Sequence, residues 1–345
     1  MTIPDHDEDQ LLRARIMLAS EIERASAVLS SRVVEAFLNV PRHPFVPVFY
    51  REEGGFHRPC ENDAGWLREV YADRVLVTEV DGVHAEDAGP EGVRGAATSS
   101  STLPSLMADM LDALDVRPGV RVLEVGTGTG YNAALLCHLA GAAHVTSVDR
   151  TERLVAAART RLREVGFAPT VVAADGAGGY PGDAPYDRII ATCGVRRLPL
   201  TWLDQCAPGG LIVVPLGGAV ARLTRLPDGR AVGRFLPRPA AFMPLRDGGT
   251  AAPEPAGPTD ADGRAGEAGS SALDDPGFAF WAGLHLGPAV ARSSPRDFWR
   301  TVEAAHRSWL DQHCPRREWF TVEAGPEGQF ASYTAPDGTT TRWPL

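Results

Sequence analysis

The pattern of apolar and polar residues between about positions 100 and 240 alternates between the period of strands and that of helices. Five short apolar runs predict strands at residues 121–125, 144–148, 170–174, 187–192 and 211–215. Between the first three of them, residues 131–139 and 151–166 place apolar side chains at helical spacing. Strands that alternate with helices predict an α/β fold with a mostly parallel sheet and helices on both faces.

The segments that flank this alternating region have other patterns. Residues 220–226 and 231–236, joined by Pro227-Asp-Gly229, predict a β-hairpin and therefore an antiparallel edge of the sheet. Residues 8–40 carry apolar side chains at helical spacing, which predicts an N-terminal helical segment. Residues 79–97 are rich in glycine and acidic residues and predict a mobile acidic loop.

The C-terminal part of the chain differs in composition from the rest. Residues 247–272 are dominated by Gly, Ala, Pro, Asp and Glu, which is typical of a flexible linker. The remainder holds five of the seven tryptophans: Trp281, Trp299, Trp309, Trp319 and Trp343. We therefore predict four units: an N-terminal helical segment at 1–100, an α/β core at 101–246, the linker, and a small Trp-rich domain at 273–345.

Charge and cysteine usage exclude some classes of function. The net charge of −10 argues against a nucleic-acid partner, because binding to phosphates needs a basic face. No apolar run is long enough for a membrane-spanning helix, and the acidic N-terminus does not resemble a secretion signal, so we interpret the protein as cytoplasmic. The five cysteines and nine histidines show no metal-ligand spacing, so no metal site is predicted.

A glycine-rich motif, Val122-Leu-Glu-Val-Gly-Thr-Gly-Thr-Gly-Tyr131, follows the first predicted strand and enters a helix. Glycines in such a turn let the backbone approach a ligand closely, and the N-terminus of the helix offers free N–H donors. Taken alone, the motif is also compatible with a tight strand–helix turn that binds nothing. We predict that it contacts a cofactor through Glu124, Gly126, Thr127, Gly128 and Gly130.

The spacing of the motif and the strand ends that follow it indicate which cofactor binds. Gly130 comes four residues after Gly126, whereas the dinucleotide fingerprint has five, which favours S-adenosylmethionine (SAM) over NAD. Asp149 ends the next predicted strand, where a carboxylate can accept both ribose hydroxyls, and Asp175-Gly176 ends the third, near an adenine amino group. Open α/β sheets bind ligands beyond the carboxyl ends of their strands, as these three sites require. An NAD-dependent oxidoreductase is the weaker alternative.

Four runs outside the glycine loop narrow the class: Val40-Pro-Arg-His-Pro-Phe-Val-Pro47, Tyr71-Ala-Asp-Arg74, Ala184-Pro-Tyr-Asp-Arg-Ile-Ile190 and Pro208-Gly-Gly-Leu-Ile-Val-Val-Pro-Leu-Gly217. Together with the loop and Asp175-Gly176, they resemble the protein-L-isoaspartate O-methyltransferase family over roughly residues 25–240. The resemblance implies a Rossmann-like SAM-dependent methyltransferase fold in the core, SAM as the cofactor, a substrate-side role for residues 1–100, and a peptide or protein substrate.

The resemblance also points to a substrate-binding hydroxyl. The family places a serine two residues before a proline, ahead of the helix that precedes the first strand, and this serine contacts the substrate carboxylate. The matching stretch here is Ser99-Ser-Ser-Thr-Leu-Pro104, so the role falls to Thr102, with Ser101 beside it. The alternative is that these hydroxyls only cap the helix that starts near Pro104.

The implied chemistry is methyl transfer to an aspartyl-type carboxylate. A carboxylate is an anion at neutral pH, so its attack on a sulfonium methyl needs no general base. It needs in-line placement, partial desolvation and a donor that orients the oxygen. The resemblance implies that the ester then collapses by attack of the following backbone nitrogen to a succinimide, which hydrolyses to aspartyl and isoaspartyl products.

Two substrate classes stay open: isoaspartyl residues in damaged proteins, which would be repaired, and a ribosomally made macrocyclic peptide, which would be matured. Similar actinobacterial enzymes with a C-terminal extension carry out such maturation. Thr102 in place of serine, the acidic segment 79–97 and the Trp-rich extension favour maturation. The extension could be a binding module for a leader or partner, or its aromatic residues could be core. The sequence leaves the oligomeric state open.

Overall fold

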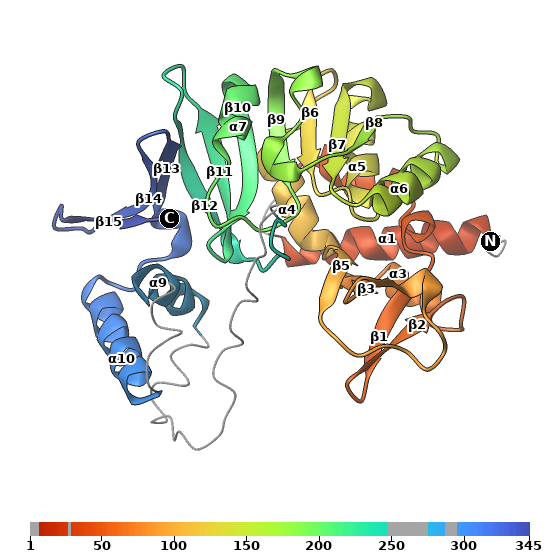
Figure 1. Ribbon diagram of the computed structural model, residues 1–345, viewed down its shortest axis with the longest axis horizontal. Coiled ribbons are helices and arrows are strands. Elements are labelled where there is room, and N and C mark those ends of the chain that lie inside the picture. The colour runs from red at the N-terminus through yellow and green to blue at the C-terminus, as the bar shows by residue number, and fades with distance from the viewer. Residues whose placement is uncertain (1–6, 27–28, 247–274, 287–294) are drawn as a thin grey trace.

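A ten-stranded sheet dominates the computed structural model, which describes residues 7–26, 29–246, 275–286 and 295–345 (Figure 1). The strand order is β15-β14-β13-β12-β11-β10-β9-β6-β7-β8. The parallel strands are β6 (Val122–Val125), β7 (Val145–Asp149), β8 (Thr170–Ala173), β9 (Tyr186–Ala191) and β10 (Cys206–Leu216). The antiparallel strands are β11 (Ala219–Arg225), β12 (Ala231–Pro239), β13 (Thr321–Gly325), β14 (Gly328–Thr334) and β15 (Thr340–Pro344).

Consecutive residues of the parallel strands enter two different apolar clusters, one on each face of the sheet. Val122 and Leu123 of β6 do so, as do Ile190 and Ile189 of β9, because side chains alternate across a strand. The first cluster includes residues of α1 (Glu8–Ala25), α2 (Ser31–Asn39), α4 (Pro104–Leu114), α5 (Tyr131–Ala140) and α6 (Glu152–Glu164). The second includes residues of α7 (Leu200–Gln205), α9 (Pro276–Leu286) and α10 (Pro295–Asp311). A block of parallel strands with helices on both faces and antiparallel strands at one edge confirms the predicted α/β fold class.

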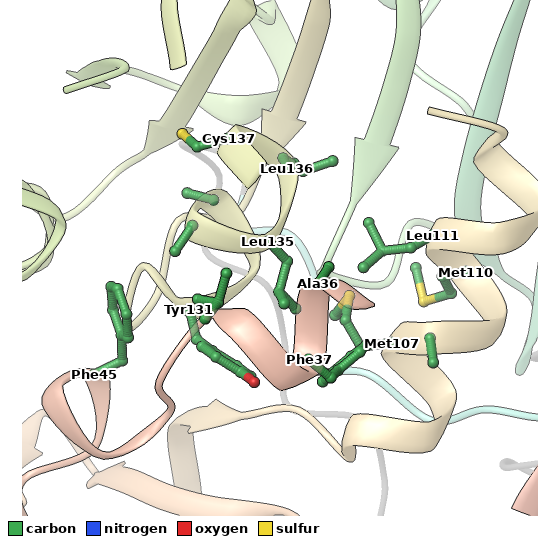
Figure 2. Close-up of a cluster of buried hydrophobic side chains, with 14 of the residues drawn as sticks. Ala36, Phe37, Phe45, Met107, Met110, Leu111, Tyr131, Leu135, Leu136 and Cys137 are labelled. Carbon is green, nitrogen blue, oxygen red and sulfur yellow. The ribbon is translucent and has the colours of Figure 1, made fainter. Parts of the chain in front are cut away.

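The core beneath α4 and α5 determines where the loops ahead of these helices lie. Figure 2 shows Phe37 of α2 beside Met107 of α4, with Leu135 of α5 facing them and Tyr131 at the start of α5. All four side chains are at most 6% exposed, and the burial of each large apolar side chain stabilises the fold by about 1.5–3 kcal/mol. This core therefore holds the N-terminal ends of α4 and α5, which follow β5 and β6, against the sheet.

A second sheet of five strands precedes α4 and contradicts one prediction. Its strands are β1 (Phe49–Glu53), β2 (Phe56–Cys60), β3 (Leu76–Val80), β4 (Val83–His84) and β5 (Ala97–Ser101), and α3 (Trp66–Val70) lies between β2 and β3. The prediction of a mobile acidic loop at 79–97 is wrong, because Val80 pairs with Ala97 in the sheet. The acidic side chains Glu86 and Asp87 instead form ion pairs with Arg161 and Arg153 of α6.

The C-terminal region continues the main sheet. Strand β13 pairs with β12, with Thr321 opposite Arg234, and β14 and β15 extend the sheet further. Trp281 of α9 and Trp343 of β15 share one apolar cluster with Trp202 of the core. The boundary predicted at residue 273 therefore divides one sheet and one cluster, and the division into four units stays a prediction. The predicted linker at 247–272 lies outside the described residues.

One buried side chain joins the C-terminal region to the core. Gln329 of β14 is 4% exposed, and its amide donates to the Leu198 carbonyl at 2.7 Å. The Gln329 carbonyl oxygen accepts from the Leu198 backbone N–H, also at 2.7 Å. The side chain thus satisfies both backbone groups of a buried residue that follows β9, as a neighbouring strand would.

We expect Gln329→Leu to lower the free energy of unfolding by about 2–3 kcal/mol, because two buried backbone groups lose their partners. Urea denaturation of the full chain measures the change. Thr340→Val is the matched control, since it removes an exposed hydroxyl pair with Thr334 from the same hairpin. Equal stability of the two variants would show that the Gln329 contact does not stabilise the fold.

Candidate active site

A cavity of about 300 Å³ lies beyond the carboxyl ends of β6, β7 and β9. Four stretches supply most of its wall: residues 98–104 within and after β5, residues 125–129 of the glycine loop, residues 148–151 at and after the end of β7, and residues 241–246. Its position agrees with the rule that places ligands of α/β folds beyond the carboxyl edge of the sheet.

The glycine loop needs glycine for two different reasons. Gly126 has φ = +100°, and a Cβ there would lie 2.5 Å from the Thr192 hydroxyl oxygen. Gly130 has φ = +90°, and its Cβ would lie 3.1 Å from Cβ of Ala158 in α6. Gly126 and Gly128 line the cavity, whereas Gly130 does not. The first two glycines therefore bring backbone to the ligand, and the third allows α5 and α6 to pack closely.

Backbone donors fix the orientation of the Asp149 carboxylate on the cavity wall. One oxygen accepts from the Gly128 N–H at 2.9 Å and the other from the Thr151 N–H at 3.0 Å. A carboxylate has about four acceptor sites, so both oxygens can still accept from a ligand. Asp149 can therefore bind two neighbouring hydroxyls, as the ribose of SAM presents them.

Glu124 lies beneath the cavity wall and is fully buried. Its carboxyl group accepts from Asn132 Nδ2 at 2.7 Å and from Ser147 Oγ at 2.5 Å, and the Thr127 hydroxyl contacts Ser147 at 2.6 Å. Burial raises the pKa of Glu124 to about 7, although the hydrogen bonds from Ser147 and Asn132 lower it. Glu124 is thus joined to two residues of the cavity wall, to Asn132 directly and to Thr127 through Ser147.

Of the two residues predicted to bind the cofactor after β8, Asp175 and Gly176, only Gly176 lines the cavity. Gly176 lines the cavity and is buried, and its carbonyl accepts from the Trp202 indole at 2.9 Å. The Asp175 side chain is exposed and accepts from the Ala177 N–H at 3.0 Å. The structure therefore brings Gly126, Thr127, Gly128, Asp149 and Gly176 together at one cavity, with Glu124, Gly130 and Asp175 behind or beside its wall.

Ser101 and Thr102 line the same cavity from the side of β5. The alternative that their hydroxyls cap α4 does not fit, because Leu103 stands at the cap position and no side-chain hydroxyl caps the helix. Asp73 does so instead, since its carboxylate accepts from the Ser105 N–H at 2.8 Å. Neither hydroxyl therefore caps the helix, and both residues belong to the cavity wall.

Sequence reasoning missed several residues of this site. Arg42 and Asp73 stand in runs that resemble the family, but nothing in those runs showed that Arg42 reaches Ser101 before α4 or that Asp73 reaches the first turn of α4. Residues 241–246 cover the cavity: Met243 and Leu245 bond to Gly194 after β9. Arg246 donates to the Thr98 carbonyl at 2.6 Å on the opposite side. No periodicity or motif distinguishes this segment in the sequence.

Two further findings concern membranes and metals. In the part of the chain that the structure describes, no helix is both long and apolar enough to cross a bilayer. Among the same residues, no three His, Cys, Asp or Glu side chains gather in a way that could hold a metal ion.

The fold and the cavity define the class of this protein as the SAM-dependent methyltransferases. A family model described as Protein-L-isoaspartate(D-aspartate) O-methyltransferase (PCMT) matches residues 68–247. The chain belongs to the protein-L-isoaspartate O-methyltransferase family. The predicted class and the predicted cofactor, SAM, are thereby confirmed, and the NAD-dependent alternative is set aside.

Relatives at the level of sequence and of structure agree with this membership. A protein-L-isoaspartate O-methyltransferase of Methanosarcina mazei is 34% identical over 221 residues, which are 64% of this chain and 76% of the relative. That of Ignicoccus hospitalis is 38% identical over 221 residues, 62% of this chain and 88% of the relative. A solved structure of a protein-L-isoaspartate O-methyltransferase shares the fold with a TM-score of 0.57 and 21% identity, over 91% of this chain and 98% of that one.

We expect Asp149→Ala to weaken SAM binding by about 2 kcal/mol, because charge-assisted hydrogen bonds to the ribose are lost. Isothermal titration calorimetry with SAM measures the affinity. Asp175→Ala should change it much less, since that carboxylate lies off the cavity wall. A loss as large for Asp175→Ala would place the adenine closer to this residue, and wild-type affinity of Asp149→Ala would remove Asp149 from the site.

The raised pKa of Glu124 predicts a dependence of stability on pH. The native state holds a proton that the unfolded chain releases at lower pH, so the wild-type fold loses stability as pH rises from about 5 through 7. Glu124→Gln has no such proton. Its stability relative to wild type should improve on the order of 2 kcal/mol between about pH 5 and pH 8. Denaturation at both pH values tests this, and a constant difference would contradict it.

Proposed function

We propose that the protein is a SAM-dependent carboxyl O-methyltransferase that esterifies an aspartyl or isoaspartyl carboxylate in a peptide or protein. One observation carries the proposal: Ser101 and Thr102 line the same cavity as the glycine loop and Asp149. Membership of the family and the names of the relatives, which are protein-L-isoaspartate O-methyltransferases, support it.

The residues present fit the cofactor and the reaction. Backbone at Gly126 and Gly128 and the Asp149 carboxylate would hold SAM, which supplies an electrophilic methyl group on a sulfonium. The acceptor carboxylate is already an anion and requires no general base. What the protein supplies is orientation by the two hydroxyls and exclusion of water by Met107 and Phe242 of the cavity wall.

Within this function, we propose maturation of a macrocyclic, ribosomally made peptide to its succinimide or isoaspartate form over general repair. Thr102 narrows the acceptor side of the cavity by one methyl group relative to the serine of the family pattern. Residues beyond 247 lie outside the family match, yet they extend the main sheet and contact the segment after β9 through Gln329. The acidic segment gives no further support, since Glu86 and Asp87 are engaged by α6.

Repair of isoaspartyl residues in damaged proteins is the second candidate, because it uses the same transfer to the same kind of carboxylate. The relatives' names favour it. Kinship with actinobacterial maturation enzymes that carry a C-terminal extension, and a cytoplasmic location, both stay predictions.

The preference for one of two peptide substrates distinguishes maturation from repair. Wild-type enzyme should methylate a linear isoaspartyl peptide slowly, and Thr102→Ser should raise kcat/KM on it about tenfold, the effect of relieving one methyl group. Mass spectrometry follows the ester and the succinimide on that peptide and on a lactam-bridged peptide that contains aspartate. A wild-type enzyme that is already fast on the linear isoaspartyl peptide, and unchanged by Thr102→Ser, would establish repair.

A further inference from the structure

We propose that Arg42 is a positioning residue for the acceptor carboxylate and acts through the hydroxyl of Ser101, which donates the orienting hydrogen bond. This inference rests on the proposed function. Arg42 itself does not line the cavity, whereas Ser101 and Thr102 do. The proposal assigns the orienting hydrogen bond to the hydroxyl of Ser101 rather than to that of Thr102.

Arg42 carries a buried charge without a direct carboxylate partner among the residues that the structure describes, although the charge of the Asp73 carboxylate partly offsets the fall in its pKa that burial causes. Its side chain is 0% exposed, and within the described part of the chain it forms no ion pair. The guanidinium donates to three backbone carbonyls at and after the end of α3, those of Val70 at 3.0 Å, Ala72 at 3.1 Å and Arg74 at 3.1 Å. Burial lowers the pKa of Arg42 only to about 10, so the group stays positive at neutral pH.

The same guanidinium reaches the acceptor side of the cavity. Its Nη2 donates to the Ser101 hydroxyl oxygen at 3.1 Å and to the Thr102 carbonyl at 3.2 Å. A guanidinium has no acceptor, so Ser101 Oγ must accept this bond and its own proton is left to donate. Among the described residues none accepts that proton, although Ser101 is 3% exposed and lines the cavity. A substrate carboxylate oxygen supplies the missing acceptor.

Apolar side chains around Arg42 limit the screening of its positive charge. Its guanidinium carbon lies 5.9 Å from the ring centroid of Tyr131. In Figure 2 that ring lies among buried apolar side chains, with Phe37 and Phe45 at centroid distances of 6.1 and 5.7 Å. Because water is excluded on this side, the positive charge is poorly screened, and the Ser101 hydroxyl becomes a stronger donor than a serine in water.

The change in charge during methyl transfer determines whether Arg42 affects KM or kcat. The acceptor oxygen forms a bond to the methyl carbon as the carbon–sulfur bond breaks, and both the carboxylate and the sulfonium become neutral. A buried cation therefore stabilises the bound carboxylate more than the transition state, in which part of that charge has gone. Arg42 and Ser101 should lower KM for the peptide with little effect on kcat, and they should hold the neutral ester weakly, which aids its release.

The test measures KM and kcat at saturating SAM for an aspartyl or isoaspartyl peptide that the wild-type enzyme methylates, with calorimetry of SAM binding beside it. Ser101→Ala should raise KM about tenfold or more, as for the loss of a hydrogen bond to a charged group, with kcat within about threefold and SAM affinity unchanged. Ser101→Thr keeps the hydroxyl and should restore most of the KM. Arg42→Lys should raise KM similarly, and the double variant should add little, because both changes break one relay.

Thr78→Val is the matched control. It removes a buried hydroxyl that bonds to Ser99 at 3.3 Å on the neighbouring strand, without any contact to Arg42, and should leave KM within about twofold. If Arg42→Lys fails to fold, the Ser101 variants and the control still decide the matter. Wild-type KM in Ser101→Ala, or additive effects of the two substitutions, would overturn the proposal. A wild-type enzyme that binds SAM but methylates neither peptide would instead refute the proposed function.

Discussion

Burial of both faces of the parallel strands is the constraint on which the rest of the structure depends. Strands β6, β9 and β10 send consecutive side chains into opposite apolar clusters, so each face needs a layer of helices. Covering both faces requires a helical connection after nearly every strand, and this arrangement gathers the carboxyl ends of the strands at one edge. The glycine loop and Asp149 meet there because β6 and β7 are neighbours. The site is a consequence of how the core is buried.

Two buried ionisable side chains flank the cavity, and burial affects them differently. Burial raises the pKa of Glu124 to about 7, so its carboxyl group is partly protonated at neutral pH, and it accepts hydrogen bonds from Ser147 and Asn132. The pKa of Arg42 falls to about 10, which leaves the guanidinium charged. The Asp149 carboxylate lines the cofactor side of the cavity, whereas the Arg42 cation organises the acceptor side. This division suits a cationic donor and an anionic acceptor.

The fold extends further toward the C-terminus than the family match does. The match ends at residue 247, whereas the sheet continues through β13, β14 and β15. These strands share an apolar cluster with the core, and in the same cluster Phe280 of α9 packs against Phe235 of β12. Gln329 bonds to Leu198, a few residues after Cys193 of the cavity wall, and Cys193 contacts the Val125 carbonyl at the start of the glycine loop. The C-terminal region is therefore connected to the cavity wall without lining the cavity.

The sequence by itself determined the alternating strands and helices, the glycine loop and the position of Asp149, because these depend on local periodicity and on neighbours along the chain. Tertiary structure alone decided which strand ends line the cavity, leaving Asp175 outside it. It also decided that Arg42 reaches Ser101, and that the acidic residues near 86 are paired with α6. These contacts join residues far apart in the chain, where no periodicity relates one position to the other. Only packing of the whole fold brings them together.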